Sequence, residues 1–103
     1  MKRKHGNALN NKKLHHLYEI LDSEEDDDVF KYGICGHPIG KDDYSKRIRE
    51  QLNLYNAVAN CVRFFARVLI TGIPGRAKAK QLEKEHVDAY EVKNGRKPRG
   101  NRD

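Results

Sequence analysis

The residues best suited to bind a cation are Glu83 and His86. If their segment is helical, they lie about one turn apart, so a carboxylate and an imidazole face the same side. Such spacing is also common on solvated helices that bind nothing. The neighbouring His15 and His16 cannot share a metal ion on a strand, because successive side chains point to opposite faces. We interpret both as ordinary surface or edge histidines.

Other catalytic patterns are missing from the sequence. We find no Ser-His-Asp or Cys-His arrangement, and the glycines at 33, 36 and 40 are not followed by the Lys-Ser or Lys-Thr pair of a phosphate loop. Cys35 and Cys61 do not form a CxxC motif, so a zinc site or a disulfide framework is not supported. We predict that both are reduced, partly buried thiols of a protein that works in a cytoplasm.

Charge indicates a polyanionic partner. The chain has 103 residues, with 21 Lys and Arg against 15 Asp and Glu, which leaves a formal charge of +6. A field of this sign attracts nucleic acid or an anionic membrane surface, although a solvated basic surface without a partner is the alternative. No apolar run is long enough to cross a bilayer, and the basic start lacks the apolar stretch of a signal peptide. The candidate phosphate-binding residues are Lys12, Lys13, Lys46, Arg49, Arg96, Lys97 and Arg99.

Negative charge is concentrated in residues 23–28, whose sequence is Ser-Glu-Glu-Asp-Asp-Asp. This run separates two apolar segments and cannot lie against phosphate. We interpret it as an exposed hairpin tip, with a cation site as the alternative.

The expected elements begin after residues 1–13, which lack an apolar period and are expected to form a flexible basic arm. Residues 14–103 would then form a single domain. The runs 14–21 and 29–34 are predicted to pair as a hairpin. Asp42 or Asp43 is expected to cap a helix that runs to about Asn56 or beyond, with its apolar stripe on one face. The stripe consists of Tyr44, Ile48, Leu52 and Tyr55.

Residues 61–71 alternate in a way that predicts a long strand, with Val62, Phe64, Ala66, Val68 and Ile70 on one face. Residues 72–75, Gly-Ile-Pro-Gly, are expected to end it. A second helix over 76–93 would bury Ala79, Leu82, His86 and Ala89, and Asn94-Gly95 would end it. The order β-β-α-β-α predicts an α+β fold in which helices flank a small three-stranded antiparallel sheet.

The two strands of the expected hairpin carry a resemblance. The segments Leu17-Tyr18-Glu19-Ile20 and Phe30-Lys31-Tyr32-Gly33-Ile34 resemble the strands that name the GIY-YIG nucleases. Tyr18 falls at the tyrosine of the first motif, and Gly33 at the glycine of the second. Lys31 stands where many members have the second tyrosine, although Tyr32 competes for that position.

The match continues in order through the rest of the chain, over about residues 14–101. Arg47, in Ser45-Lys46-Arg47, falls at the family's essential arginine, with Arg49 as the alternative. Glu83 falls at the metal-binding glutamate, and Asn101 at the late asparagine. The chain is most similar to the nuclease domains at the C-termini of bacterial polymorphic toxins, where an arm such as His5-Gly6-Asn7 precedes the first strand.

The resemblance implies roles for Tyr18, Lys31, Arg47, Glu83 and Asn101 as catalytic residues. Glu83 would hold Mg²⁺, or Mn²⁺ in its place, to neutralise phosphate charge and assist the leaving oxygen. Arg47 would stabilise the charge that builds on the non-bridging oxygens. Tyr18, shifted toward ionisation by Lys31, would act as general base toward water, or would simply orient that water.

The sequence therefore predicts a metal-dependent endonuclease that hydrolyses DNA, with RNA as a second substrate to test. It would be the toxic domain of an interbacterial effector, acting in the cytoplasm of a target cell and opposed by an acidic immunity protein. A catalytically silent basic module that binds nucleic acid is the rival interpretation. A cleavage assay with and without metal separates the two.

Overall fold

The computed structural model describes residues 13–36 and 45–101, which form three strands and two α-helices. Their order is β-β-α-β-α, so the predicted α+β fold is confirmed. The predicted arm lies outside the described residues except for Lys13. The elements are β1 (Leu14–Asp22), the short 3-10 helix η1 (Ser23–Glu25), β2 (Asp28–Cys35), α1 (Lys46–Ala59), β3 (Phe64–Pro74) and α2 (Arg76–Asn94).

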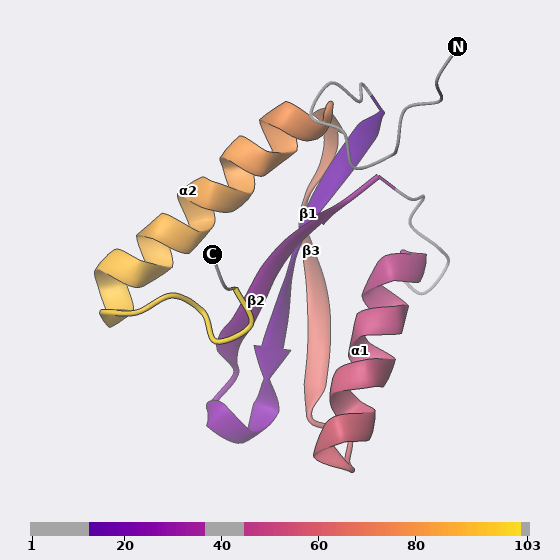
Figure 1. Cartoon of the computed structure of the whole chain (residues 1–103), viewed down its shortest axis with the longest axis vertical. Coiled ribbons are helices and arrows are strands. Elements are labelled where there is room, and N and C mark those ends of the chain that lie inside the picture. The colour runs from indigo at the N-terminus through magenta and orange to yellow at the C-terminus, as the bar shows by residue number, and fades with distance from the viewer. Residues whose placement is uncertain (1–12, 37–44, 102–103) are drawn as a thin grey trace.

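The sheet has the order β2-β1-β3, and both pairings are antiparallel. The first strand is therefore central, and it is buried over nearly its whole length. The helices pack on opposite faces, so side chains alternate along β1 between two separate cores (Figure 1). Even-numbered residues of β1, such as Tyr18 and Ile20, therefore pack against α1, whereas odd-numbered ones, such as Leu17, pack against α2.

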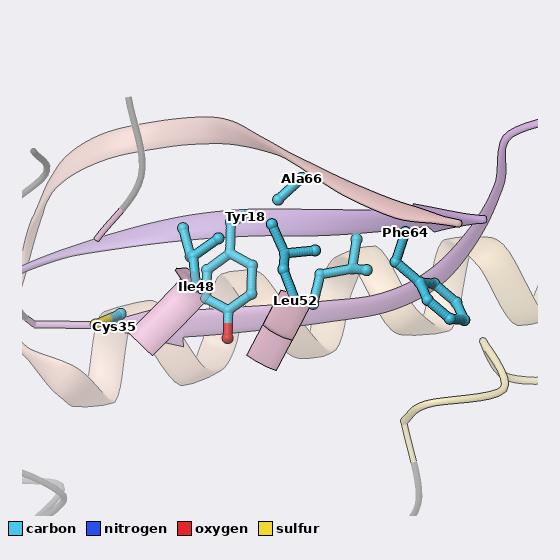
Figure 2. Packing of buried hydrophobic residues seen from close by; sticks show 7 residues of the cluster. Tyr18, Cys35, Ile48, Leu52, Phe64 and Ala66 are labelled. Atoms are coloured by element: carbon cyan, nitrogen blue, oxygen red, sulfur yellow. The ribbon is translucent and has the colours of Figure 1, made fainter. Parts of the chain in front are cut away.

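The larger core lies between the sheet and α1, and Tyr18 is at its centre (Figure 2). A smaller core lies under α2. The buried members of the larger core are Tyr18, Ile20, Cys35, Ile48, Leu52, Phe64 and Ala66. Those of the smaller one are Leu17, Ile34, Ile73 and Ala79.

The acidic hairpin tip is exposed at residues 23–27, as predicted. Asp22 caps η1 by accepting a hydrogen bond from the Glu24 backbone N–H at 3.1 Å. Asp26 and Asp27 adopt left-handed backbone angles, with φ of 54° and 60°. Asp is among the residues that tolerate this region, because its short polar side chain makes local hydrogen bonds.

Two predicted boundaries were wrong. The cap of α1 is Ser45, whose buried hydroxyl accepts from the Ile48 backbone N–H, whereas the predicted caps Asp42 and Asp43 lie outside the described residues. The third strand runs three residues later than predicted: Val62 is 92% exposed outside it, and Ile73 is buried within it. The turn residues 72–74 continue the strand because pairing of Leu14 with Pro74 and His15 with Ile73 extends the ladder.

The histidine prediction was also wrong. His15 and His16 are both buried, because β1 is the central strand and has a helix over each face. His15 Nδ1 lies 2.7 Å from the Lys13 carbonyl oxygen, and His16 Nε2 lies 3.2 Å from the Ser45 hydroxyl. Of the two free cysteines, Cys35 is buried as expected but Cys61 is exposed.

The predicted core stripe of α2 is correct at its start and wrong at its end. Ala79 is buried and Leu82 and His86 are half-buried, but Ala89 is exposed and Tyr90 is buried in its place. The buried face of α2 therefore turns toward the start of β2 in the C-terminal part of the helix. Neither α1 nor α2 is long and apolar enough to cross a membrane.

Candidate active site

Tyr18 lies on β1 directly opposite Gly33 of β2, and its ring occupies the space that a side chain at Gly33 would need. A Cβ atom at Gly33 would lie 2.4 Å from Tyr18 Cζ and 2.5 Å from its hydroxyl oxygen. Carbon atoms normally approach no closer than about 3.5 Å. The glycine of the second motif is thus required by the tyrosine of the first.

The Tyr18 hydroxyl projects from the ring end that is farthest from β1, among side chains of α1 (Figure 2). It donates a hydrogen bond to Gln51 Oε1 at 2.6 Å. Burial raises the pKa of Tyr18 to about 12, although the charge of Arg47 and a hydrogen bond with it act in the opposite direction. The predicted shift toward ionisation was therefore wrong. Because the phenol is neutral at physiological pH, its oxygen can accept a hydrogen bond, which fits the alternative of a water-orienting group.

Arg47 and Gln51 reach Tyr18 from the same face of α1, since residues four apart on a helix are neighbours. Ser45 fixes where this helix begins, and so fixes the direction in which both side chains project. Burial is the largest influence on the pKa of Tyr18, Tyr55 and Lys31, raising it for the two tyrosines and lowering it for the lysine, and the charge of Arg47 acts to lower the pKa of all three. The guanidinium of Arg47 therefore places a positive charge at the Tyr18 end of the larger core. Gln51 was not predicted, although its spacing from Arg47 is a signal that the sequence contains.

Lys31 connects the two faces of the sheet. It lies on the edge strand β2 opposite Ile20. Its pKa is lowered mainly by burial and then by the charge of Arg47, while the carboxylate of Glu83 partly restores it. The charge of a residue on α1 and the charge of a residue on α2 thus both act on this ammonium group.

The side chain of Tyr32 points away from Lys31 and Arg47, and its ring contacts that of His86, with the two ring centroids 5.5 Å apart. Of the two residues that competed for the second motif position, Lys31 is therefore the one that the structure brings to Arg47.

Glu83 approaches from α2, where its side chain is only 18% exposed and Lys80 Nζ is 3.3 Å from its Oε1. In the described part of the chain, no group of three His, Cys, Asp or Glu side chains is arranged to hold a metal ion. A single carboxylate nonetheless suits Mg²⁺, which usually keeps several waters and binds one or two carboxylates together with substrate phosphates. The side chains present are therefore compatible with the predicted ion.

A family model matches residues 8–95, which is most of the chain; the family is described as URI fold toxin 2. This chain belongs to the URI fold toxin 2 family. Comparisons with curated proteins and with solved structures find no match. The matched residues include Tyr18, Lys31, Arg47 and Glu83.

Asn101 follows the matched region of this toxin domain and binds the backbone of β2. Its side-chain amide accepts from the Tyr32 N–H at 2.7 Å and donates to the Tyr32 carbonyl at 2.9 Å. Gly100 N–H adds a bond to the Phe30 carbonyl at 2.6 Å. Both groups of the amide thus hold the edge strand beside Lys31, while the predicted catalytic role of Asn101 stays a prediction.

A buried carboxylate joins the C-terminal segment of the toxin domain to its hairpin. Asp22 is fully buried and accepts from Arg63 at 2.7 and 2.8 Å and from Arg99 at 2.7 Å. These hydrogen bonds, that of Arg63 foremost, lower the pKa of Asp22 to about 2. The sequence signal for this residue is its even position on β1, which places it on the same face as Tyr18 and Ile20.

The predicted phosphate-binding residues fall into two groups. Lys13, Lys46 and Arg49 are exposed, and Lys97 is half-buried. Arg96 and Arg99 instead contact the hairpin: Arg96 pairs with Asp28 at 3.2 Å, and Arg99 binds Asp22. Lys12 lies outside the described residues. Phosphate binding by this set stays a prediction.

Proposed function

We propose that this toxin domain is a Mg²⁺-dependent endonuclease of the GIY-YIG type that hydrolyses phosphodiester bonds of DNA. The observation that supports the proposal is the convergence of chemically suited side chains from separate elements. Tyr18 of β1 interacts with Arg47 of α1, and Lys31 of β2 interacts with both Arg47 and Glu83 of α2. These are the positions implied by the GIY-YIG resemblance, and their side chains supply a hydroxyl, two cations and a carboxylate.

The chain's own residues have separable tasks in this proposal. Arg47 presents a permanently charged planar fork, which binds the non-bridging oxygens as negative charge builds on them. The neutral Tyr18 hydroxyl donates a hydrogen bond to Gln51, so the lone pairs of its oxygen can accept a hydrogen bond from the attacking water and orient it. Lys31, whose pKa is lowered mainly by burial, can supply a cation that binds the phosphate.

Glu83 is the residue that would hold the metal ion. Mg²⁺, or Mn²⁺ in its place, supplies charge neutralisation on the phosphate and help for the leaving oxygen. Glu83 forms an ion pair with Lys80, and its side chain is 18% exposed, so the carboxylate can still be reached from solvent.

The cellular setting of the proposal follows from the toxin family and from charge. The formal charge of +6 suits a polyanionic substrate, with DNA first and RNA as the second class to test. An acidic immunity protein is the expected antagonist, because its field would complement the same surface. The domain would act as an effector in the cytoplasm of a target cell.

The test is cleavage of supercoiled plasmid and of total RNA, each with Mg²⁺ and with EDTA. Glu83→Gln keeps the shape of the side chain and removes its charge, so we expect a large loss of the Mg²⁺-dependent rate. Glu85→Gln is the matched control, since Glu85 is an exposed residue of the same helix. Wild-type cleavage by a folded Glu83→Gln variant would contradict the metal-binding role. Binding without cleavage of either substrate would favour the silent basic module.

A further inference from the structure

A hollow of about 360 Å³ lies between the start of β2 and the C-terminal half of α2. Its lining includes the rings of Tyr32, His86 and Tyr90 and the polar side chains of Asp28, Lys93 and Asn94. Small-molecule sites occupy roughly 300–1,000 Å³, so this volume suits one planar heterocycle. In Figure 1 the segment that follows α2, in yellow, runs from the end of that helix back to β2, where the Gly100 N–H donates to the Phe30 carbonyl.

The aromatic lining is held in place by hydrogen bonds. The Tyr90 hydroxyl donates to Asp28 Oδ1 at 2.6 Å, and the rings of Tyr32 and His86 meet at 59°. His86 Nδ1 lies 2.8 Å from the Leu82 carbonyl, which can only accept, so this nitrogen carries the proton. In a neutral His86 the other ring nitrogen is then an acceptor, suited to an amine or ring N–H of a base.

The hollow adjoins the candidate active site. His86 follows Glu83 by three residues, which is about 4.5 Å along the axis of α2. Tyr32 follows Lys31 on β2, and because successive strand side chains alternate, its ring faces α2, the helix that carries Glu83. A phosphate held at Glu83 would therefore bring the base of a neighbouring nucleotide within reach of the rings of Tyr32 and His86.

Charge decides which part of that nucleotide enters. Asp27 and Asp28 line the hollow together with one lysine, Lys93, and Asp28 already accepts hydrogen bonds from Tyr90 and Arg96. Because carboxylates outnumber cations in this lining, it favours an uncharged base, which can donate hydrogen bonds and stack, over a phosphate. The paired, stacked bases of a duplex do not expose such a face.

We propose that this hollow is a nucleobase subsite that takes one unpaired base beside the phosphate to be cut, so that the domain prefers single-stranded or looped nucleic acid. The inference rests on the proposed function for its substrate class. It does not require that cleavage be observed, because base binding is measurable on its own.

The experiment measures binding by fluorescence anisotropy in EDTA, with the full chain carrying Glu83→Gln to prevent cutting. The probes are a short labelled single strand, the same strand with abasic sites, and its blunt duplex, each as DNA and as RNA. We expect the single strand to bind more tightly than the abasic strand of equal charge. Tyr32→Leu should weaken single-strand binding by about fivefold to a hundredfold, as loss of one base-aromatic stack does, and should leave duplex binding unchanged.

Phe65→Leu is the matched control, since Phe65 is a partly exposed aromatic residue on β3, away from the hollow. It should leave all affinities unchanged. Equal affinity of the Glu83→Gln chain for normal and abasic strands, in both DNA and RNA, would overturn the proposal, and this result does not depend on the folding of Tyr32→Leu. Base-dependent binding by a domain whose wild type cuts nothing would refute the nuclease and keep the subsite. Cleavage without base-dependent binding would do the reverse.

Discussion

Replacement of Gly33 by Ala should destabilise the domain through a single clash with Tyr18. The added Cβ would lie 2.4 Å from Tyr18 Cζ, more than 1 Å inside the normal approach of about 3.5 Å. The ring cannot easily move away, because its hydroxyl is bound to Gln51 and Ile48 and Leu52 are buried in the same core. The clash must therefore shift β2 or break the hydrogen bond.

The size of the effect follows from two opposing contributions. Overpacking a core typically costs about 1–3 kcal/mol. Gly-to-Ala substitution also restricts the unfolded chain, which favours folding by roughly 0.4–1 kcal/mol. We expect a net loss of about 1–2 kcal/mol in the free energy of unfolding of Gly33→Ala. If the clash is the cause, the loss should disappear when Tyr18 is also replaced by Ala.

The assay is urea unfolding followed by circular dichroism on the wild type, both single variants and the double variant. The coupling free energy between the two sites should be at least about 1 kcal/mol. Gly72→Ala is the control: Gly72 has a φ of 67° and open space around it, so its cost comes from the backbone alone and should add to that of Tyr18→Ala. A loss below about 0.5 kcal/mol for Gly33→Ala, or an equal loss in the Tyr18→Ala background, would refute the reasoning.

Three further results are expected. The pKa of Asp22 falls from 3.8 to about 2 on folding, so the stability that its carboxylate contributes is present above pH 4 and is lost as the pH drops toward 2. Asp22→Asn should lower the free energy of unfolding at neutral pH by roughly 1–3 kcal/mol. In urea unfolding, this variant should also show a weaker loss of stability between pH 4 and pH 2 than the wild type. Arg47→Ala should lower the cleavage rate on the order of a hundredfold or more, and the double variant with Tyr18→Phe should lose little more than either single variant. Deleting residues 1–13 should flatten the salt dependence of duplex DNA affinity, because fewer counterions are released.

Each of these three predictions would be contradicted by a specific result. An acid limb shared by the wild type and Asp22→Asn would mean that another carboxyl controls low-pH stability. Wild-type rates for both Arg47→Ala and Tyr18→Phe would remove these groups from the mechanism, and fully multiplied losses would mean that they act independently. An unchanged salt slope would mean that residues 1–13 do not contact the phosphate backbone.

The hairpin could be predicted from the sequence because its information is local. Apolar runs on both sides of the acidic segment 23–28 specify two strands and the exposed tip between them. The same holds for the stripe of Ile48 and Leu52 on α1, whose period is that of a helix. The boundaries were less well predicted, because Ser45 caps α1 and Pro74 still lies in β3. Pairing with β1 extended the third strand through residues that usually end one.

The candidate site was predicted only as a set of positions. Tyr18, Lys31, Arg47 and Glu83 were named from their order in the chain, but nothing local places Lys31 between α1 and α2. The ionisation of Tyr18 was predicted in the wrong direction, since its pKa depends on burial under α1 more than on nearby charge. Gln51 and Asp22 were missed because their partners are 33 and 41 residues away in the chain.

The sequence by itself determined the α+β class, the order of the elements and the pairing of a tyrosine-bearing strand with a glycine-bearing one. These follow from periodicity and turn chemistry, which act over a few residues. Only the tertiary structure decided which charges are buried, as at Asp22, and which side chains meet across elements, as at Lys31. The physical reason is that desolvation and Coulomb interactions depend on distances between segments remote in sequence, and packing of the helices against the sheet sets those distances.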